Sequence, residues 1–196
     1  MKGFLVILSS PSGGGKTSVI HRIIEKHDGN FVYSISATTR QPRPGEEHGK
    51  DYFFLTQQEF EEQIKENLLL EWEQVHGYYY GTPKTYVEQA IAAGKYVLLD
   101  IDVRGALQIA QKFPENTLTI FVAPPSLDEL IQRLRNRKTD SETEINKRLE
   151  RIPLEMEQSK RFDYVVINEK LDRTVNEIVQ IIQKNQKKKL VSDHFK

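Results

Sequence analysis

Cysteine is absent from this sequence of 196 residues. The chain can therefore form no disulfide and has no thiolate nucleophile or cysteine metal ligand, which is compatible with a reducing compartment. Long apolar runs are absent too, because every apolar segment is far shorter than the roughly 20 residues of a membrane-spanning helix. No small-residue cleavage site follows the first apolar run, so we predict no secretory signal. These absences predict a cytoplasmic location and no membrane partner.

An excess of charge of either sign is also missing. Lys and Arg together number 28, as do Asp and Glu, so the formal net charge is zero. With no overall field that favours a polyanion, we predict no nucleic-acid partner, and any phosphate must be bound by local clusters of cations. The run Lys187-Lys188-Lys189, within a basic tail over residues 185–196, is interpreted as the solvated end of a last helix.

Apolar runs that alternate with helical patterns predict an α/β fold. A length of 196 residues suits one domain with small insertions. Because the apolar runs are continuous rather than alternating, they are typical of a parallel sheet flanked by helices on both faces, as in P-loop NTPase cores. The predicted strands are Phe4–Ser9, Tyr96–Asp100, Leu118–Val122 and Tyr164–Ile167.

Residues 32–83 and 126–161 differ from this core. The first segment is rich in Tyr, Thr, Arg and Glu, and Thr56 to Glu59 reads as a capping box that starts a helix. The second holds two further boxes, Ser126…Glu129 and Ser141…Glu144, and several arginines: Arg133, Arg135, Arg137, Arg148 and Arg151. An arginine-rich pair of helices between core strands indicates a lid, and the alternative is a solvated charged face.

The segment that follows the first strand carries the strongest functional signal. It approaches the phosphate-binding pattern G-x-x-x-x-G-K-[ST] and lies between a strand and an amphipathic helix, so it predicts a nucleoside triphosphate site. Its residues are Ser10, Pro11, Ser12, Gly13, Gly14, Gly15, Lys16, Thr17 and, beyond the motif, Ser18. Lys16 would supply a mobile positive charge and Thr17 a hydroxyl for Mg²⁺. The alternative is a glycine-rich turn beside a chance lysine.

Arg40 and Arg43 form a second cluster. Pro42 and Pro44 restrict the backbone around them, so both guanidinium groups can be held toward one anion. Arginine binds phosphate in a bidentate manner, which favours a phosphate site here. The tyrosines of residues 78–80 could donate to the same phosphate or could simply pack.

Two acidic positions predict further chemistry. Glu71 lies in an apolar setting, where a carboxylate is either exposed or engaged in hydrogen bonds. A carboxylate can accept both donors of the guanine N1–H and 2-amino edge, whereas adenine offers no such pair. Asp100 ends an apolar strand, a usual place for a group that holds Mg²⁺ directly or through water. The alternative, which applies to Asp102 in particular, is a cap for the next helix.

Taken in order, the motifs resemble the guanylate kinase family over about residues 3–184. They are Ser36, Thr38-Thr39-Arg40, Pro42-Arg43, Gly45-Glu46, Gly49-Lys50-Asp51-Tyr52, Glu71-Trp72, Tyr79-Tyr80-Gly81-Thr82, Leu99-Asp100-Ile101-Asp102 and Ile145-Asn146-Lys147-Arg148-Leu149. The resemblance implies a core of residues 3–31, 84–125 and 162–184, a GMP-binding region of residues 32–83 and a lid of residues 126–161. It further implies Mg²⁺-dependent transfer of a phosphoryl group from ATP to GMP, with dGMP as a further expected substrate.

The resemblance also implies a role for each site residue. The guanine side would be formed by Ser36, Glu71, Thr82 and Asp100, and the GMP phosphate would be held by Arg40, Arg43, Tyr52 and Tyr80. Lys16, Arg137 and Arg148 would stabilise the transferring group, with Arg40 also counted as catalytic, Arg133 as a further lid cation and Asn168 near the adenine.

The sequence departs from the family pattern at two places and leaves two rivals open. Ser10 stands where glycine is usual, and Lys138 replaces the glycine of the lid turn, so both local geometries need inspection. One rival function is a non-catalytic module that reuses the GMP site to bind partners, although such modules tend to lose the phosphate loop. The other is a kinase for AMP, UMP or dTMP. The chain could act as a monomer or a homo-oligomer.

Overall fold

A five-stranded parallel sheet forms the centre of the protein. The computed structural model describes residues 3–27, 29–75, 77–136 and 142–193. The strands are β2 (Phe31–Ser34), β7 (Tyr96–Asp100), β1 (Phe4–Ser9), β8 (Thr117–Ala123) and β9 (Tyr164–Ile167), in that spatial order. All four strand pairs are parallel, which confirms the predicted α/β core.

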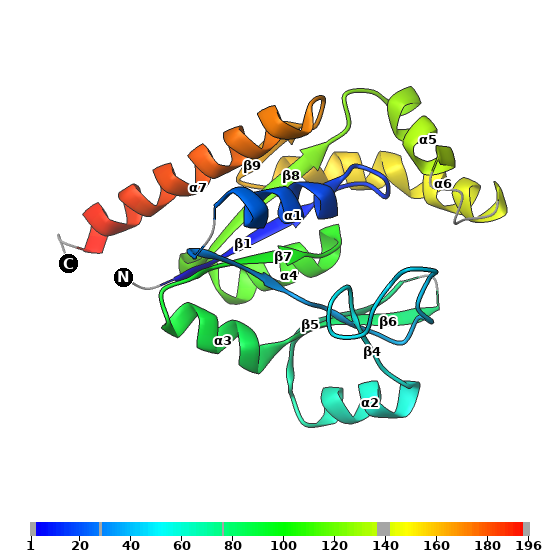
Figure 1. Ribbon diagram of the computed structural model, residues 1–196, viewed down its shortest axis with the longest axis horizontal. Helices are drawn as coiled ribbons and strands as arrows, with labels where there is room; N and C mark the ends of the chain where they lie inside the picture. Colours follow the sequence, from blue (N-terminus) through cyan, green and yellow to red (C-terminus); the bar gives the residue numbers. More distant parts are fainter. Residues whose placement is uncertain (1–2, 28, 76, 137–141, 194–196) are drawn as a thin grey trace.

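Helices cover both faces of this sheet (Figure 1). Helices α1 (Lys16–Lys26) and α7 (Leu171–Asp193) pack on one face, and α3 (Lys84–Ala92) and α4 (Val103–Lys112) on the other. Successive side chains of β1 alternate between the two cores: Val6 and Leu8 face α1 and α7, whereas Leu5 and Ile7 face α3 and α4. A strand with two buried faces must be apolar throughout, which explains the continuous run in the sequence.

A smaller sheet of four strands lies beyond one edge of the core (Figure 1). Its order is β4 (Phe53–Phe54), β3 (Ala37–Thr38), β6 (Tyr78–Pro83) and β5 (Leu69–Val75). Helix α2 (Gln57–Lys65) packs on it through Phe60, which stacks on Tyr79 with the ring centroids 5.3 Å apart. The predicted capping box at Thr56 is confirmed by reciprocal hydrogen bonds with Glu59.

Strand β2 belongs to the core sheet rather than to the smaller one. It pairs with β7, so the first residues of the segment 32–83 are part of the core. β2 fits in the core sheet because its side chains pack on both faces. Val32 contacts the core on the side of α3 and α4, and Tyr33 contacts the core on the side of α1 and α7. The smaller sheet begins at Ala37.

Helices α5 (Leu127–Asn136) and α6 (Glu142–Gln158) follow β8 and lie near the end of β1 that leads into α1 (Figure 1). Ser126 caps α5 by accepting a hydrogen bond from the Glu129 N–H at 3.1 Å. Ser141 and Lys138 lie outside the described residues. Short 3₁₀ turns, η1 (Pro114–Asn116) and η2 (Ser159–Arg161), precede β8 and β9.

The last helix, α7, continues to Asp193, so most of the predicted basic tail is helical. Among the residues that the structure describes, no helix combines the length and the apolar character needed to cross a membrane.

Candidate functional site

The loop that joins β1 to α1 has the backbone shape of a phosphate cradle. Gly13 and Gly15 have φ angles of 90° and 91°, a region that favours glycine. Among the described non-glycine residues only Asn67 has a positive φ, so Ser10 needs no glycine-like conformation. Ser10 is buried, and its hydroxyl donates to the Pro11 carbonyl at 3.0 Å. A serine therefore fits this position without backbone strain.

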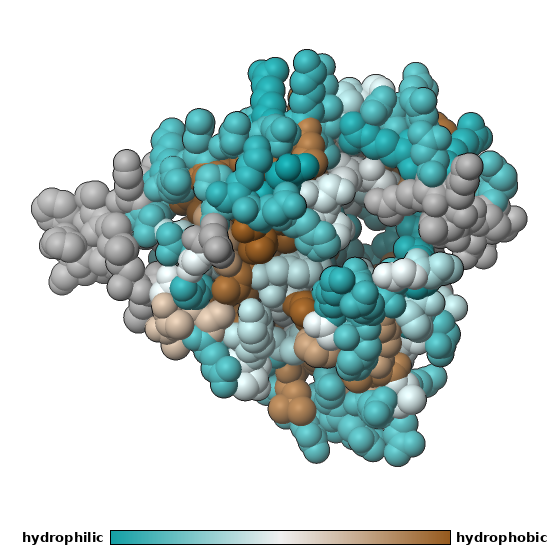
Figure 2. All heavy atoms as spheres, viewed as in Figure 1, coloured by the Kyte–Doolittle hydropathy of each residue, from teal (hydrophilic) through white to brown (hydrophobic). Residues whose placement is uncertain are grey.

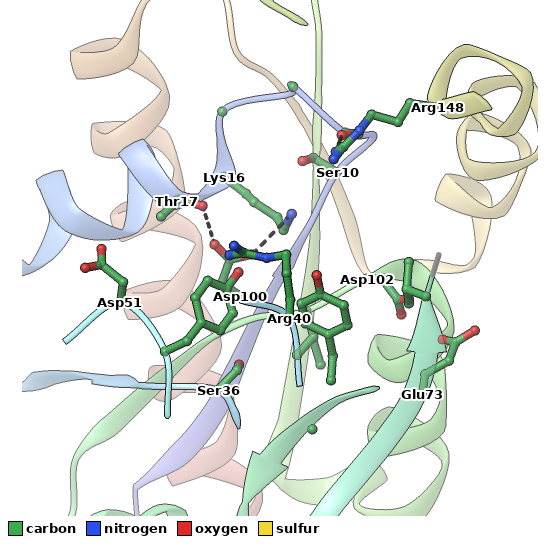
Figure 3. A pocket seen from close by; sticks show the side chains of 18 of the residues that line it. Ser10, Lys16, Thr17, Ser36, Arg40, Asp51, Glu73, Asp100, Asp102 and Arg148 are labelled. Atoms are coloured by element: carbon green, nitrogen blue, oxygen red, sulfur yellow. Dashed lines mark hydrogen bonds and ion pairs between the residues drawn. The ribbon is translucent and has the colours of Figure 1, made fainter. Parts of the chain in front are cut away.

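Lys16, Thr17 and Asp100 meet where the loop enters α1 (Figure 3). The Lys16 ammonium lies 3.2 Å from Asp100 Oδ1, and the Thr17 hydroxyl donates to Asp100 Oδ2 at 2.5 Å. The contact arises because β1 and β7 are parallel neighbours, so their carboxyl ends share one edge of the sheet. Asp100 thus contacts the first two residues of α1, where the loop ends.

A hydroxyl and a carboxylate are the hard oxygen donors that Mg²⁺ prefers, so this set fits that ion. Within the described part of the chain, no group of three or more His, Cys, Asp or Glu residues could form a protein cage for a metal. A magnesium ion here would need phosphate oxygens and water for its remaining ligands.

Arg40 is held rigidly in the smaller sheet's half of the site. Its Nη1 and Nη2 donate to the two carboxylate oxygens of Glu46, each at 2.9 Å, and its guanidinium lies 5.4 Å from the centre of the Tyr52 ring. Burial tends to raise the pKa of Glu46, but the hydrogen bonds from Arg40 and from the Arg43 N–H lower it overall. Glu46 therefore stays ionised and orients Arg40. Sequence reasoning gave it no role, although it stands in the motif that holds Arg43.

Two tyrosines that line the site, Tyr33 and Tyr52, keep their hydroxyl protons. Burial, reinforced by the charge of Asp100, raises the pKa of Tyr52 and of Tyr33 well above the usual value. Neither hydroxyl loses its proton near neutral pH, so each can donate a hydrogen bond to an anion. Tyr33 was not among the predicted site residues.

Glu71 is buried on β5 and lines the site. Its Oε1 accepts a hydrogen bond from the Thr82 hydroxyl at 2.6 Å. Burial raises the pKa of Glu71 to about 7. Gly105 permits this position, because a Cβ there would lie 2.7 Å from Glu71 Oε2. The carboxyl group therefore rests against the first turn of α4.

Asp102 and Glu73 complete an acidic group around Glu71. Asp102 Oδ1 accepts from the Gly105 N–H at 2.8 Å, which confirms the alternative that Asp102 caps α4. Glu73 Oε1 accepts from Arg104 Nη1 at 3.2 Å. Glu73 was missed in the sequence, although residues two apart on a strand share a face and Glu71 had been singled out.

Helix α6, which follows β8, contacts the loop between β1 and α1. Arg148 Nη1 donates to the Ser12 hydroxyl at 2.5 Å. The carboxyl of Glu155, also on α6, accepts from the Ser12 N–H, and its pKa is raised by burial. Arg137 lies outside the described residues.

Arg133 and Asn168 link helix α5 to the loop between β1 and α1. Arg133 Nη2 donates to the Asn168 carbonyl at 3.1 Å, and the Asn168 amide donates to the Gly14 carbonyl at 2.9 Å. On the opposite side, Arg133 Nε contacts Glu129 Oε1 at 3.1 Å. The structure thus ties α5 to the loop through Arg133, which was predicted as a lid cation, and Asn168, which was predicted to lie near the adenine.

A cavity of about 410 Å³ is lined by residues of the core, of the smaller sheet and of α6. The face of the molecule in Figure 2 is hollowed between the core and the smaller sheet. Predicted residues that line the cavity are Ser10, Ser12, Gly13, Gly15, Lys16, Thr17, Ser36, Arg40, Arg43, Tyr52, Glu71, Tyr80, Asp100 and Arg148. Among the described residues with a predicted role, Pro11, Gly14, Ser18, Thr82, Arg133 and Asn168 lie outside the lining.

Comparison with known proteins agrees with this arrangement. A family model described as guanylate kinase matches residues 2–185. The chain belongs to the guanylate kinase family. Members of this family phosphorylate GMP with ATP. In this chain, the residues that line the cavity include Lys16 of the glycine-rich segment and the buried Glu71.

Guanylate kinases from distant bacteria are similar to this one along nearly their whole length. The Prochlorococcus marinus protein is 50% identical over 179 residues, which are 91% of this chain and 96% of the relative. The Bacillus subtilis protein is 48% identical over 181 residues, with 92% and 88% covered. The crystal structure of guanylate kinase from Anaplasma phagocytophilum superposes with a TM-score of 0.78 at 32% identity, and 94% of this chain and 87% of that chain are covered.

Proposed function

We propose that this chain carries out the Mg²⁺-dependent transfer of the ATP γ-phosphoryl group to GMP with the cavity residues in separate roles. The observation that supports this division is a single cavity that is lined both by Lys16, where the loop enters α1, and by Glu71 on β5. A nucleotide bound at each end would bring a γ-phosphate toward a 5′-phosphate between Lys16 and Arg40. Cytoplasm, where both nucleotides are metabolites, is the proposed location.

At the donor end we assign the triphosphate to the backbone N–H groups of the loop and to Lys16. When bound, Mg²⁺ would neutralise phosphate charge, held by Thr17 and by Asp100 directly or through water. The contact of Asp100 with Lys16 and Thr17 favours this role over contact with guanine. Arg148, already beside the loop at Ser12, is placed to meet the charge of the transferring group, with Arg137 as a second lid cation.

At the acceptor end we assign the GMP phosphate to Arg40, Arg43, Tyr52 and Tyr80. The Glu46 carboxylate leaves Arg40 ordered before the substrate arrives, which reduces the entropy lost on binding. Guanine would be read by Glu71, which accepts from N1–H and the 2-amino group, and Ser36 and Thr82 would complete this pocket. The smaller sheet, within residues 32–83, would thus hold GMP.

Transfer needs no covalent intermediate on the protein. An oxygen of the GMP phosphate must lie in line with the γ-phosphorus, about 3 to 3.5 Å away, and positively charged groups must stabilise the transition state. Water must be excluded, because it would otherwise accept the phosphoryl group. We assign this exclusion to a lid of residues 126–161 that closes over the loop.

An ADP-release assay with parallel acceptors tests the proposal. With ATP and Mg²⁺, we expect rapid turnover of GMP, slower or comparable turnover of dGMP, and little with AMP, UMP or dTMP. Preference for AMP, UMP or dTMP would make the chain another monophosphate kinase. Failure with every acceptor would instead favour a partner-binding module, although the intact Lys16 and Thr17 speak against that alternative.

A further inference from the structure

Glu73 is an acidic residue of the cavity that the proposed reaction does not use. It follows Glu71 by two residues on β5, so the two side chains leave the strand on the same face. Both line the cavity, together with Asp102 from the start of α4. In Figure 3 the carboxyl groups of Glu73 and Asp102 point toward one another at the edge of the cavity. Only 14% of the Glu73 side chain is exposed.

In the carboxyl groups of Glu73 and Asp102, one oxygen accepts a hydrogen bond from a described residue and the other does not. Arg104 Nη1 binds Glu73 Oε1, and the Gly105 N–H binds Asp102 Oδ1. Among the described residues, the other oxygens, Glu73 Oε2 and Asp102 Oδ2, are buried without a donor. Two neighbouring acceptors are unfavourable unless a donor lies between them. In the free protein a shared proton can serve, which agrees with a pKa of Glu73 raised to about 7 by burial and by Asp102.

A ligand amino group would supply that donor. Guanine carries its 2-amino group beside N1–H, and this edge is the one assigned to Glu71. Glu71 can accept from N1–H and from one amino hydrogen, which leaves the second amino hydrogen to be satisfied. Glu73 lies on the same face of β5 as Glu71, and both residues line the same cavity.

We propose that Glu73 is a specificity-determining residue that accepts a hydrogen bond from the 2-amino group of the bound guanine. This inference rests on the proposed function, since it needs GMP in the cavity. The competing explanation is that Glu73 merely positions Asp102, with no contact to the base.

Inosine monophosphate separates these explanations, because it is GMP without the 2-amino group. We would measure kcat/KM and the dissociation constants of both nucleotides for the wild type, Glu73→Ala and Glu73→Gln. Gln74→Ala is the matched control, since Gln74 is the next residue of β5 and is exposed on the opposite face. Thermal unfolding of each variant checks that the fold is kept.

We expect Glu73→Ala to lower the preference for GMP over inosine monophosphate by about tenfold or more, because it removes a charged acceptor. The loss should appear in KM and the dissociation constant for GMP, with kcat and the constants for inosine monophosphate nearly unchanged. Glu73→Gln is the sharper variant. Arg104 donates to one oxygen and so keeps the amide oxygen on its side, which turns the amide NH₂ toward Asp102 and the base.

In Glu73→Gln the position of Asp102 is therefore kept while an acceptor becomes a donor. We expect the preference for GMP to be lost in this variant as well. Retention of the preference in Glu73→Gln would mean that Glu73 only positions Asp102, and retention in Glu73→Ala would mean that it has no part in selection. Either result overturns the inference while GMP turnover by the wild type stands. Absence of GMP binding and turnover in the wild type would overturn the proposed function itself.

Discussion

At the scale of single residues, the site contrasts charges that are paired with charges that are buried. Lys16 is paired with Asp100, and Arg40 with Glu46, whereas the donor that Glu71 finds among the described residues is the Thr82 hydroxyl. Burial raises the pKa of Glu71, so the charge of this carboxyl group depends on pH near neutrality. Two predictions follow from this contrast.

Lys16→Ala should remove phosphoryl transfer while leaving the protein folded. The Lys16 ammonium is a charge aimed at the transferring group, and loss of one such charge typically costs about a hundredfold to a thousandfold in kcat. The ADP-release rate and the circular dichroism spectrum measure the two effects. Lys84→Ala, which removes a partly exposed lysine on α3, is the control. Full activity of Lys16→Ala would contradict the proposed role.

GMP should bind more weakly as the pH falls from 8 to 6. Burial raises the pKa of Glu71 to about 7, so the free protein has a mostly ionised carboxylate at pH 8 and a mostly neutral carboxyl group at pH 6. Only the ionised form accepts both guanine donors, so the dissociation constant should rise about tenfold at one pH unit below this pKa. Calorimetric titration measures it.

Glu71→Gln supplies the control for this pH dependence. The variant cannot titrate at that position, so any slope that remains belongs to the phosphate group of GMP and to other residues. An identical slope in the wild type and in Glu71→Gln would show that the carboxyl of Glu71 does not control the affinity.

At the scale of helices and strands, the start of α4 links local structure to the site. Gly105→Ala should strengthen the helix slightly, since alanine is favoured over glycine in a helix by about 1 kcal/mol. The new Cβ would approach within 2.7 Å of Glu71 Oε2, so the carboxylate must move. We expect a higher KM for GMP, an unchanged KM for ATP and little change in the unfolding temperature. An unchanged KM for GMP would mean that Glu71 is not fixed by α4.

How far the sequence predicts these elements depends on where the stabilising contacts lie. Strand β1 has the bounds expected from its apolar run, because a strand buried on both faces needs apolar residues at every position. Strands β3 and β4 have two residues each, and no period can be recognised in so short a segment. Their pairing depends instead on contacts distant in sequence.

The site residues divide in the same way. The phosphate loop could be predicted because its chemistry is contained in one short segment. The acidic group could not, since Glu73 and Asp102 meet only after β5 and the start of α4 pack together. The brace of Arg133 and Asn168 likewise joins residues 35 positions apart, and only the three-dimensional structure reveals it.

At the scale of the whole molecule, the cavity is shared by the core sheet, the smaller sheet and α6. Two ligands that require the same closed arrangement help one another, because the first one bears the free-energy cost of closure. We therefore expect a non-hydrolysable ATP analogue to lower the dissociation constant of GMP by about fivefold or more. Calorimetry with and without the analogue measures this coupling.

Thermodynamic linkage gives that experiment an internal check. GMP must lower the dissociation constant of the analogue by the same factor, since the coupling free energy is a property of the pair. Equal dissociation constants with and without the second ligand would show that the two ends of the cavity act independently.

The brace from Glu129 through Arg133 to Asn168 and Gly14 has a mechanical consequence. It joins α5 to the loop between β1 and α1. We expect a lid that includes α5 to turn about this contact rather than to move away from the core as a whole.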